Sequence, residues 1–269
     1  MTLSVWIGAL LGAAVIAWAL EHIGAVGTFL GGHALIIVYG GSLAATMIST
    51  PGTMIWRAFT RLLRLFLPDR LPAPEQAIAE AVRLARLAQS GGGILAIQGE
   101  SQNFADGFLH RAVIAAVSSG ETAETRRMME AEVKRRRSDG MEDSNTFRTI
   151  GILTPMFGLL GTLIGMVKVL QTMSDPTRVG PAMALALSSA FLGISTANLI
   201  CVPVAGHIRL KVIEETLIYE ILLEGVLDIA SGKSPYVIET HLSAYAARRR
   251  VEAEEAPASA VAPAAARAP

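Results

Sequence analysis

The chain has 269 residues, of which 52% are hydrophobic and only 17% are charged, and its 23 Lys and Arg residues balance its 23 Asp and Glu residues. This composition excludes an intrinsically disordered chain, a collagen-like chain and a nucleic-acid-binding protein. Because a soluble domain carries about a quarter charged residues, the deficit predicts that part of the chain lies in lipid.

Four segments are long and apolar enough to cross a bilayer as helices, which takes roughly 20 residues each. They cover residues 3–20, 33–55, 149–167 and 179–208, and none contains Asp, Glu, Lys or Arg. A cleavable signal peptide is the alternative for the first segment. That segment lacks a basic region before it and a short polar cleavage zone after it, so we expect it to be retained.

The basic residues set the expected orientation. Fourteen of them lie between Arg57 and Arg148, and seven lie from Arg209 onward. Basic loops stay on the cytoplasmic side of a membrane, so both regions and both termini are predicted to be cytoplasmic.

The sequence thus predicts an all-α, multi-pass protein of the inner membrane. Its expected parts are a transmembrane hairpin at 1–55, a helical cytoplasmic domain at 56–148, a second hairpin at 149–208 with spans at 149–167 and 181–206, cytoplasmic helices at 209–250, and a disordered Ala/Pro-rich tail at 251–269.

The cytoplasmic insertion is expected to be helical. Directly after the second segment, Arg57, Arg61 and Arg64 share one helical face and large apolar residues the other, a pattern typical of a helix on a membrane surface. Pro74 begins a further helix that ends at Gly91, and another is expected from about Phe104 to Val117. Beyond the last span, an amphipathic helix carries Glu220, Glu224 and Asp228 one turn apart.

Motifs of enzymes and cofactor sites are absent from the sequence. There is no phosphate-binding loop, no metal-spaced cluster of Cys or His, and no nucleophile elbow, and the single cysteine, Cys201, lies in an apolar stretch. We therefore expect no enzyme activity, no cofactor and no metal. An ion-conducting protein normally needs an ionisable group at membrane depth. If this chain conducts ions, a partner protein must supply the carboxylate.

Small residues form a stripe on each of the last two spans. Pro155, Gly158, Thr162 and Gly165 share one face of the third, and a comparable stripe on the fourth consists of Ala182, Ala186, Ser189, Gly193 and Thr196. Ordinary helix packing explains such stripes equally well, since small residues bring backbones together. Pro155 and Pro203 favour a functional role, because each removes a helix hydrogen bond and leaves polar backbone inside the membrane.

Three stretches carry a resemblance to a known family. TPMFGLLGTLIGMVKVL (154–170), GPAMALALSSAFLGISTANLICVPVAG (180–206) and ILLEGVLDIASGKSPYVIETHLSAYAARRR (221–250) resemble the MotA/PomA family of flagellar stator subunits, as do the four-span layout and the Gly-Gly pair of VYGGSLAA (38–45). The wider superfamily includes ExbB and TolQ, which typically have three spans. Four predicted spans therefore favour the stator branch.

The resemblance implies a mechanism. Such subunits form a ring, a pentamer by analogy, around a MotB-like single-span, peptidoglycan-binding partner whose intramembrane Asp carries the ion, while the insertion pushes on the switch-ring protein of the flagellar rotor. Pro155 and Pro203 match the two span prolines of the family, and Thr162 matches its pathway threonine. The residues expected to line the ion pathway or face the partner are Pro155, Gly158, Thr162, Ser189, Ala190 and Pro203.

Ala190 also bears on the choice of ion. Sodium-driven members of the family tend to have a threonine there, and a sodium ion needs several oxygen ligands. We therefore expect proton drive, although Ser188, Ser189 and Thr162 could supply oxygens.

The insertion departs from the family pattern at the expected rotor contact. Gln98 stands where a Glu is usual, and Ser90 and Gly91 occupy the usual basic positions. Arg83, Arg86 and Glu100 are the substitutes, unless they are only solvated surface charges. Two alternatives to the stator stay open. One is an ExbB/TolQ-like proton channel that energises outer-membrane transport or envelope maintenance, and the other is a passive scaffold or solute carrier.

Overall fold

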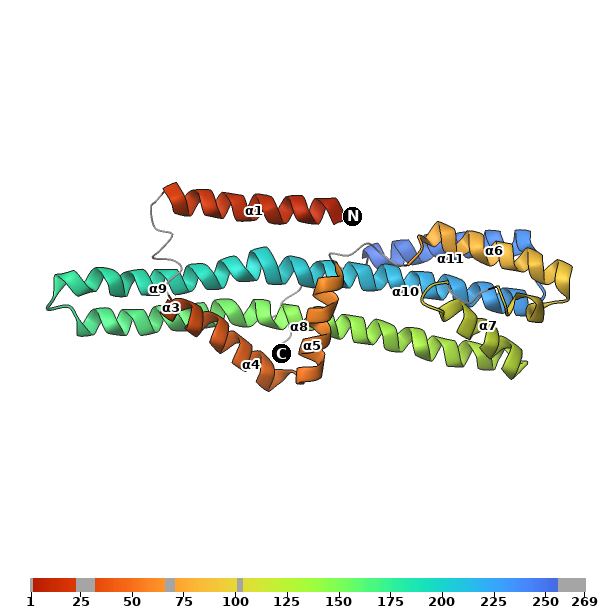
Figure 1. Cartoon of the computed structure of the whole chain (residues 1–269), viewed down its shortest axis with the longest axis horizontal. Coiled ribbons are helices and arrows are strands. Elements are labelled where there is room, and N and C mark those ends of the chain that lie inside the picture. The colour runs from red at the N-terminus through yellow and green to blue at the C-terminus, as the bar shows by residue number, and fades with distance from the viewer. Residues whose placement is uncertain (1, 23–31, 66–70, 101–103, 256–269) are drawn as a thin grey trace, which may run out of the picture. The chain divides into compact units, whose positions relative to one another are not determined.

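The computed structural model describes residues 2–22, 32–65, 71–100 and 104–255 (Figure 1). In these residues the chain forms helices joined by turns, and no strand. They group into two compact units. The first unit comprises residues 1–67 and 140–209, and the second comprises residues 68–139 and 210–269.

The first unit contains most of the apolar helices. In chain order its helices are α1 (Thr2–His22), α3 (Gly32–Leu35), the π-helical turn η1 (Ile36–Gly40), α4 (Gly41–Ser49), α5 (Gly52–Leu65), the C-terminal part of α8 (Thr122–Gln171), α9 (Pro176–Thr196), the π-helical turn η3 (Ala197–Cys201) and the start of α10 (Val202–Ala230). Three helical stretches of the described chain are long and apolar enough to cross a membrane: Gly32–Ser49, a part of α8, and a part of Thr177–Ala230.

Helix α1 covers the first predicted segment. Its side chains Leu10, Leu11, Val15 and Trp18 are largely exposed to the surroundings of the chain. Exposed apolar residues on a helix of 21 residues fit a lipid environment.

The second predicted segment is shorter than the sequence suggested. It was expected to reach Ile55, but the helix ends at Ser49, and residues 52–55 begin the amphipathic helix α5. Thr50 adopts an extended backbone with φ −133° and ψ 130°. The reason is Pro51, because a proline disfavours the helical conformation of the residue before it.

Helix α8 continues where the sequence predicted two elements. It runs through 50 residues, from the insertion into the third predicted span. Its interior contains Gly140 and Pro155 without a break in the helix. The change from charged to apolar residues at Arg148 therefore marks a change of environment and not the end of a helix.

The second unit is built on a hydrophobic core. Its helices are α6 (Pro74–Gly91), the 3-10 turn η2 (Ile94–Ile97), α7 (Phe108–Ser119), the N-terminal part of α8, the larger part of α10, and α11 (Pro235–Glu255). Helices α6 and α11 lie side by side, and Phe108, Leu84, Ile221 and Leu242 are buried in the core (Figure 1). Gly225 permits close packing, since a Cβ atom there would lie 2.9 Å from the Ala81 Cβ.

The structure has the predicted helices of this unit with small shifts. Helix α6 has the predicted bounds and ends at Gly91, directly before Gly92, whose φ of 95° suits glycine. Helix α7 begins at Phe108, because residues 104–107 form a turn with positive φ at Ala105, Asp106 and Gly107. Helix α11 extends to Glu255, so the first residues of the predicted tail are helical, while 256–269 lie outside the described residues.

Candidate functional site

The small-residue stripes of α8 and α9 pack against each other within the chain, and Figure 1 shows these helices side by side. A Cβ atom on Gly158 would lie 2.8 Å from the Ser189 carbonyl oxygen and 3.3 Å from the Gly193 Cα. In return, a Cβ on Gly193 would lie 2.8 Å from the Thr154 carbonyl oxygen. The two backbones are therefore in direct contact, as small residues allow in membrane helices.

Two of the predicted partner-facing residues belong to this internal contact. Gly158 and Ser189 are buried between α8 and α9, and the Ser189 Oγ donates a hydrogen bond to the Leu185 carbonyl at 3.0 Å. Because both residues are covered by their own chain, they hold the helix pair together and present no surface to a partner. The stripe was visible in the sequence, but a stripe does not reveal which helix it meets.

The other four predicted pathway residues remain accessible. Pro155, Thr162 and Ala190 are half-buried, and Pro203 is exposed. The Thr162 Oγ1 donates to the Leu159 carbonyl at 2.6 Å, which leaves its lone pairs available as acceptors. These residues can therefore contact another molecule.

Two π-helical turns interrupt the apolar helices, and sequence reasoning missed both. In η3 the Val202 N–H donates to the Ala197 carbonyl, a bond one residue wider than in an α-helix. A hydrogen bond of 2.7 Å joins the Tyr39 hydroxyl of η1 to the Thr196 hydroxyl directly before η3. Pro203 could have indicated η3, because a proline lacks the N–H of a regular helix hydrogen bond and irregular helix turns are frequent beside it.

An ion-pair cluster joins α5 to α8. The Asp143 carboxylate is 1% exposed and lies 2.7 Å from the Arg57 Nε and 3.4 Å from an Arg61 guanidinium nitrogen. Arg57 also lies 3.0 Å from the Glu142 carboxylate. The basic face predicted for this helix is therefore directed in part at a neighbouring helix, while Trp56 and Leu63 remain exposed.

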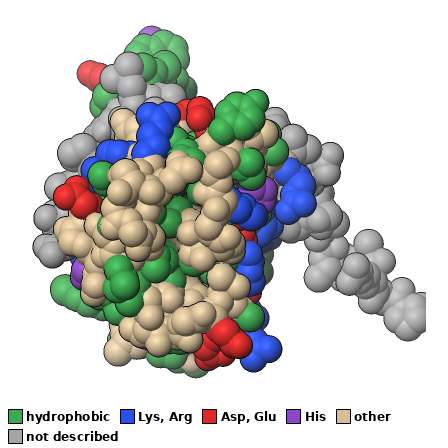
Figure 2. Space-filling view, turned by 90° about the vertical axis from the view of Figure 1, so that its right-hand side faces the viewer, with side chains coloured by type: hydrophobic (Ala, Val, Ile, Leu, Met, Phe, Trp, Pro, Cys, Tyr) green, Lys and Arg blue, Asp and Glu red, His purple; other side chains and the backbone are tan. Residues whose placement is uncertain are grey.

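The three predicted rotor-contact residues are only partly brought together. Arg83 of α6 lies 2.8 Å from the Glu80 carboxylate and 3.3 Å from Glu100, and hydrogen bonding to Glu80 raises the pKa of Arg83. Arg86 is exposed on the same helix. Figure 2 shows basic and acidic side chains interspersed with hydrophobic ones on one face of the molecule.

The acidic stripe of α10 pairs with basic groups of the second unit. Glu220 lies 3.0 Å from Arg249, Glu224 binds Arg126 at 2.9 Å, and buried Asp228 lies 2.7 Å from Lys233 and 2.6 Å from the His241 Nδ1. The hydrogen bonds that Arg126 donates to the Glu224 carboxylate raise the pKa of Arg126. The pairs Glu220–Arg249 and Asp228–His241 join α10 to α11, whereas Glu224–Arg126 joins α10 to α8.

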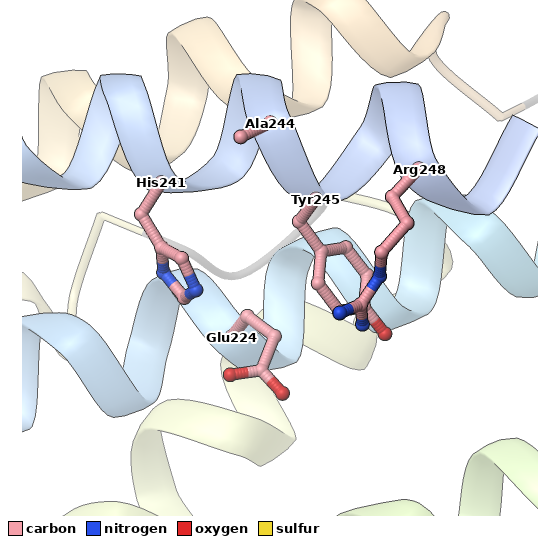
Figure 3. A pocket seen from close by; sticks show the side chains of 5 residues that line it. All are labelled: Glu224, His241, Ala244, Tyr245 and Arg248. Atoms are coloured by element: carbon pink, nitrogen blue, oxygen red, sulfur yellow. The ribbon is translucent and has the colours of Figure 1, made fainter.

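A shallow pocket lies between α10 and α11. It is lined by Glu224, His241, Ala244, Tyr245 and Arg248 (Figure 3). Burial raises the pKa of Tyr245. Glu224, His241 and Tyr245 already have hydrogen-bond partners within the chain. We therefore interpret the pocket as part of the contact between α10 and α11 and not as a ligand site.

Comparison with known proteins identifies the family. The chain is 30% identical over 213 residues to motility protein A of Bacillus subtilis, covering 79% of this chain and 78% of that protein. The chain belongs to the motility protein A family. It is also 28% identical over 257 residues to chemotaxis protein PomA of Vibrio alginolyticus, covering 95% of this chain and 100% of PomA.

Two further comparisons agree with this family. The model of the MotA/TolQ/ExbB proton channel family matches residues 100–221. The structure resembles a chain of the flagellar MotAB stator complex from Bacillus subtilis with a TM-score of 0.79 and 26% identity, covering 92% of this chain and 98% of that chain. The named relatives are a motility protein and a chemotaxis protein, and the similar structure is that of a flagellar stator complex, which favours the stator branch over an ExbB/TolQ-like energiser.

Proposed function

We propose that the chain is a stator subunit of the bacterial flagellar motor, and that it forms an ion channel with a MotB-like single-span partner. The observation that carries the proposal is a close-packed helix pair without a carboxylate side chain, Lys or Arg. Residues 149–167 and 179–208 contain no Asp, Glu, Lys or Arg, yet Pro155, Thr162 and Ala190 stay accessible beside the contact of α8 with α9. Such a pair can guide an ion only if a partner carries the acid.

The proposal includes a membrane arrangement. In it the chain crosses the bacterial inner membrane four times, and both termini lie in the cytoplasm. The four spans are α1, α3–α4, the apolar part of α8, and α9 with η3 and the start of α10. The basic residues between Arg57 and Arg148 support this orientation. Several copies of the chain surround the partner, by analogy with a ring of five.

In the proposed mechanism, Pro155, Thr162, Ala190 and Pro203 face the partner helix. Protonation and release of the partner's acid then shift the ring around that helix, and the second unit contacts the rotor through Arg83, Arg86 and Glu100. Each charge that crosses about 100 mV delivers roughly 2.3 kcal/mol. Many ions are therefore needed for a large mechanical output.

Replacement of Pro155 tests the pathway. In a strain that lacks the gene, the unmodified chain should restore swimming, and Pro155→Leu should not, because a leucine supplies an N–H and removes the polar backbone that the proline creates. Membrane insertion, followed by cell fractionation, should be unchanged. Normal swimming by the variant would remove Pro155 from the pathway.

The ion itself is tested by varying sodium at fixed pH. We propose a proton, because Ala190 offers no hydroxyl as a sodium ligand. Swimming speed of the complemented strain should then be independent of sodium concentration. A steep rise of speed with sodium would assign the channel to sodium.

A further inference from the structure

The second unit exposes apolar side chains at the end where α6 stops. Residues 87–99, which include the end of α6 and the turn η2, contain no Asp, Glu, Lys or Arg. Gly92 and Gly93 have φ values of 95° and 94°, which glycine adopts without strain. They lead into η2, where Ile97 is buried in the core and Leu95 is 65% exposed. Leu95 therefore stays outside the core that its neighbour joins.

Helix α11 adds two exposed side chains at the same end. Helices α6 and α11 pack against each other, and Figure 1 shows that α6 ends and α11 begins at the same end of this unit. Tyr236 and Val237, in the first turn of α11, are 78% and 47% exposed, whereas Ile238 is fully buried. We call Leu95, Tyr236 and Val237 the apolar cap. In Figure 2, which faces this end, hydrophobic and uncharged atoms fill the middle of the view.

Two charged side chains that flank the apolar cap along the chain are already paired. The Glu100 carboxylate lies 3.3 Å from Arg83, which also lies 2.8 Å from Glu80. The Lys233 ammonium lies 2.7 Å from the buried carboxylate of Asp228. A partner that bound these charges would compete with the existing pairs, and exposed ion pairs contribute less than about 1 kcal/mol. An apolar contact meets no such competitor.

The position of the apolar cap limits what can cover it. In the proposed membrane arrangement, α10 leaves the bilayer near Leu210 and continues to Ala230, a rise of about 30 Å. Tyr236 follows shortly after that end, so lipid is out of its reach. Copies of the chain that surround one partner helix meet along the sides of their helices and not at the helix ends. A cytoplasmic protein is therefore the occupant that fits.

We propose that the apolar cap docks on an apolar surface of the rotor's switch-ring protein. The inference rests on the proposed function and adds the chemistry of the rotor surface, which is apolar where it meets Leu95 and Tyr236. Aromatic and other apolar side chains form the centre of a protein interface, and charged residues form its rim. Arg83, Arg86 and Glu100 then belong to the rim of this contact.

Photo-cross-linking in swimming cells tests the docking surface. Leu95 and Tyr236 are replaced one at a time by a photoreactive phenylalanine analogue in the full chain, and the captured proteins are identified by mass spectrometry. We expect the switch-ring protein at both positions. Leu210 is the matched control, because it is an apolar residue of the same unit that is 53% exposed but lies about 30 Å along α10 from Ala230. Its yield with the switch-ring protein should be several-fold lower.

Any other cross-linking result contradicts the docking surface. Cross-links only between copies of the chain would assign the apolar cap to an interface within the ring. No product with the switch-ring protein would show that the apolar cap does not meet the rotor. Equal yields at Leu210 and Leu95 would show that the contact is not specific to the cap.

Swimming speed distinguishes an apolar contact from a charged one. Leu95→Asp should slow swimming several-fold, because it places a charge in an apolar interface. Leu95→Met keeps the apolar volume and should swim nearly normally. Arg83→Gln combined with Glu100→Gln removes two charges of the rim and should slow swimming less than Leu95→Asp. A larger loss in the double variant would assign the contact to the charges and overturn the apolar one.

Proton flux of the Leu95→Asp complex separates the two levels of the argument. Reconstituted with the single-span partner, this variant should conduct like the unmodified complex, and a loss of flux would contradict a role limited to docking. Normal swimming by Leu95→Asp would remove the docking surface and leave the stator function standing. If the unmodified chain neither restores swimming nor conducts with a single-span partner, the proposed function fails.

Discussion

Gly158 and Gly193 set the distance between α8 and α9. A Cβ atom added at either glycine would lie 2.8 Å from a carbonyl oxygen of the other helix, which is closer than real Cβ contacts allow. Because backbone atoms and not flexible side chains are in the way, the helices cannot make room by changing rotamers. These two positions therefore tolerate only glycine in the observed packing.

Gly158→Ala should destabilise the helix pair. Overpacking of this kind costs about 1–3 kcal/mol, so the thermal unfolding midpoint in detergent should fall, and motility should fall with it. Gly206→Ala is the matched control, because a Cβ there would meet no atom within 4 Å. An equal midpoint for both variants would contradict the close approach of α8 and α9.

The sequence predicted the small-residue stripes but not which helix each stripe contacts. Gly158 and Ser189 were expected to face a partner, and they are buried against each other's helix. A stripe of glycine, serine and alanine has the same pattern whichever helix it contacts, so the sequence could not distinguish the two. The sequence indicated polar backbone near Pro203, but it did not reveal the π-helical turn η3.

At the scale of elements, α5 is fixed to α8 by a buried carboxylate. Asp143 pairs with Arg57 and Arg61, so the basic face of α5 serves an internal contact as well as any contact with lipid headgroups. The sequence predicted this amphipathic face correctly. It could not indicate the acid, because Asp143 is 86 residues from Arg57 along the chain.

Asp143→Asn should loosen α5. Removing the charge from a buried ion pair costs about 3 kcal/mol, and hydrogen exchange of the α5 amides should become faster. Glu142→Gln is the matched control, since that side chain is 41% exposed and such pairs contribute less than about 1 kcal/mol. If exchange in α5 is the same in both variants, Asp143 does not anchor the helix.

Helix boundaries were predicted well where the chain contains strong local signals. Helix α6 runs from Pro74 to Gly91 as expected, because a proline begins it and Gly92 with positive φ ends it. The end of α4 at Ser49 was missed, because an apolar stretch continues past Pro51. The continuity of α8 was also missed, since hydropathy reports the environment of a helix and not its length.

The molecule as a whole keeps its acidic side chains, lysines and arginines outside its long apolar segments. The four apolar segments of the sequence carry no Asp, Glu, Lys or Arg. Residues 100–221 match the model of the MotA/TolQ/ExbB proton channel family. A conducting complex must therefore take its carboxylate from a second polypeptide, and the chain alone should be a poor conductor.

Proton flux into liposomes tests this claim most directly. The purified chain is reconstituted alone and together with its single-span partner, and the decay of an imposed pH gradient is followed with a fluorescent dye. The account predicts that the chain alone leaves the gradient as stable as in empty liposomes, and that the partner makes it decay. Rapid decay with the chain alone would contradict the account.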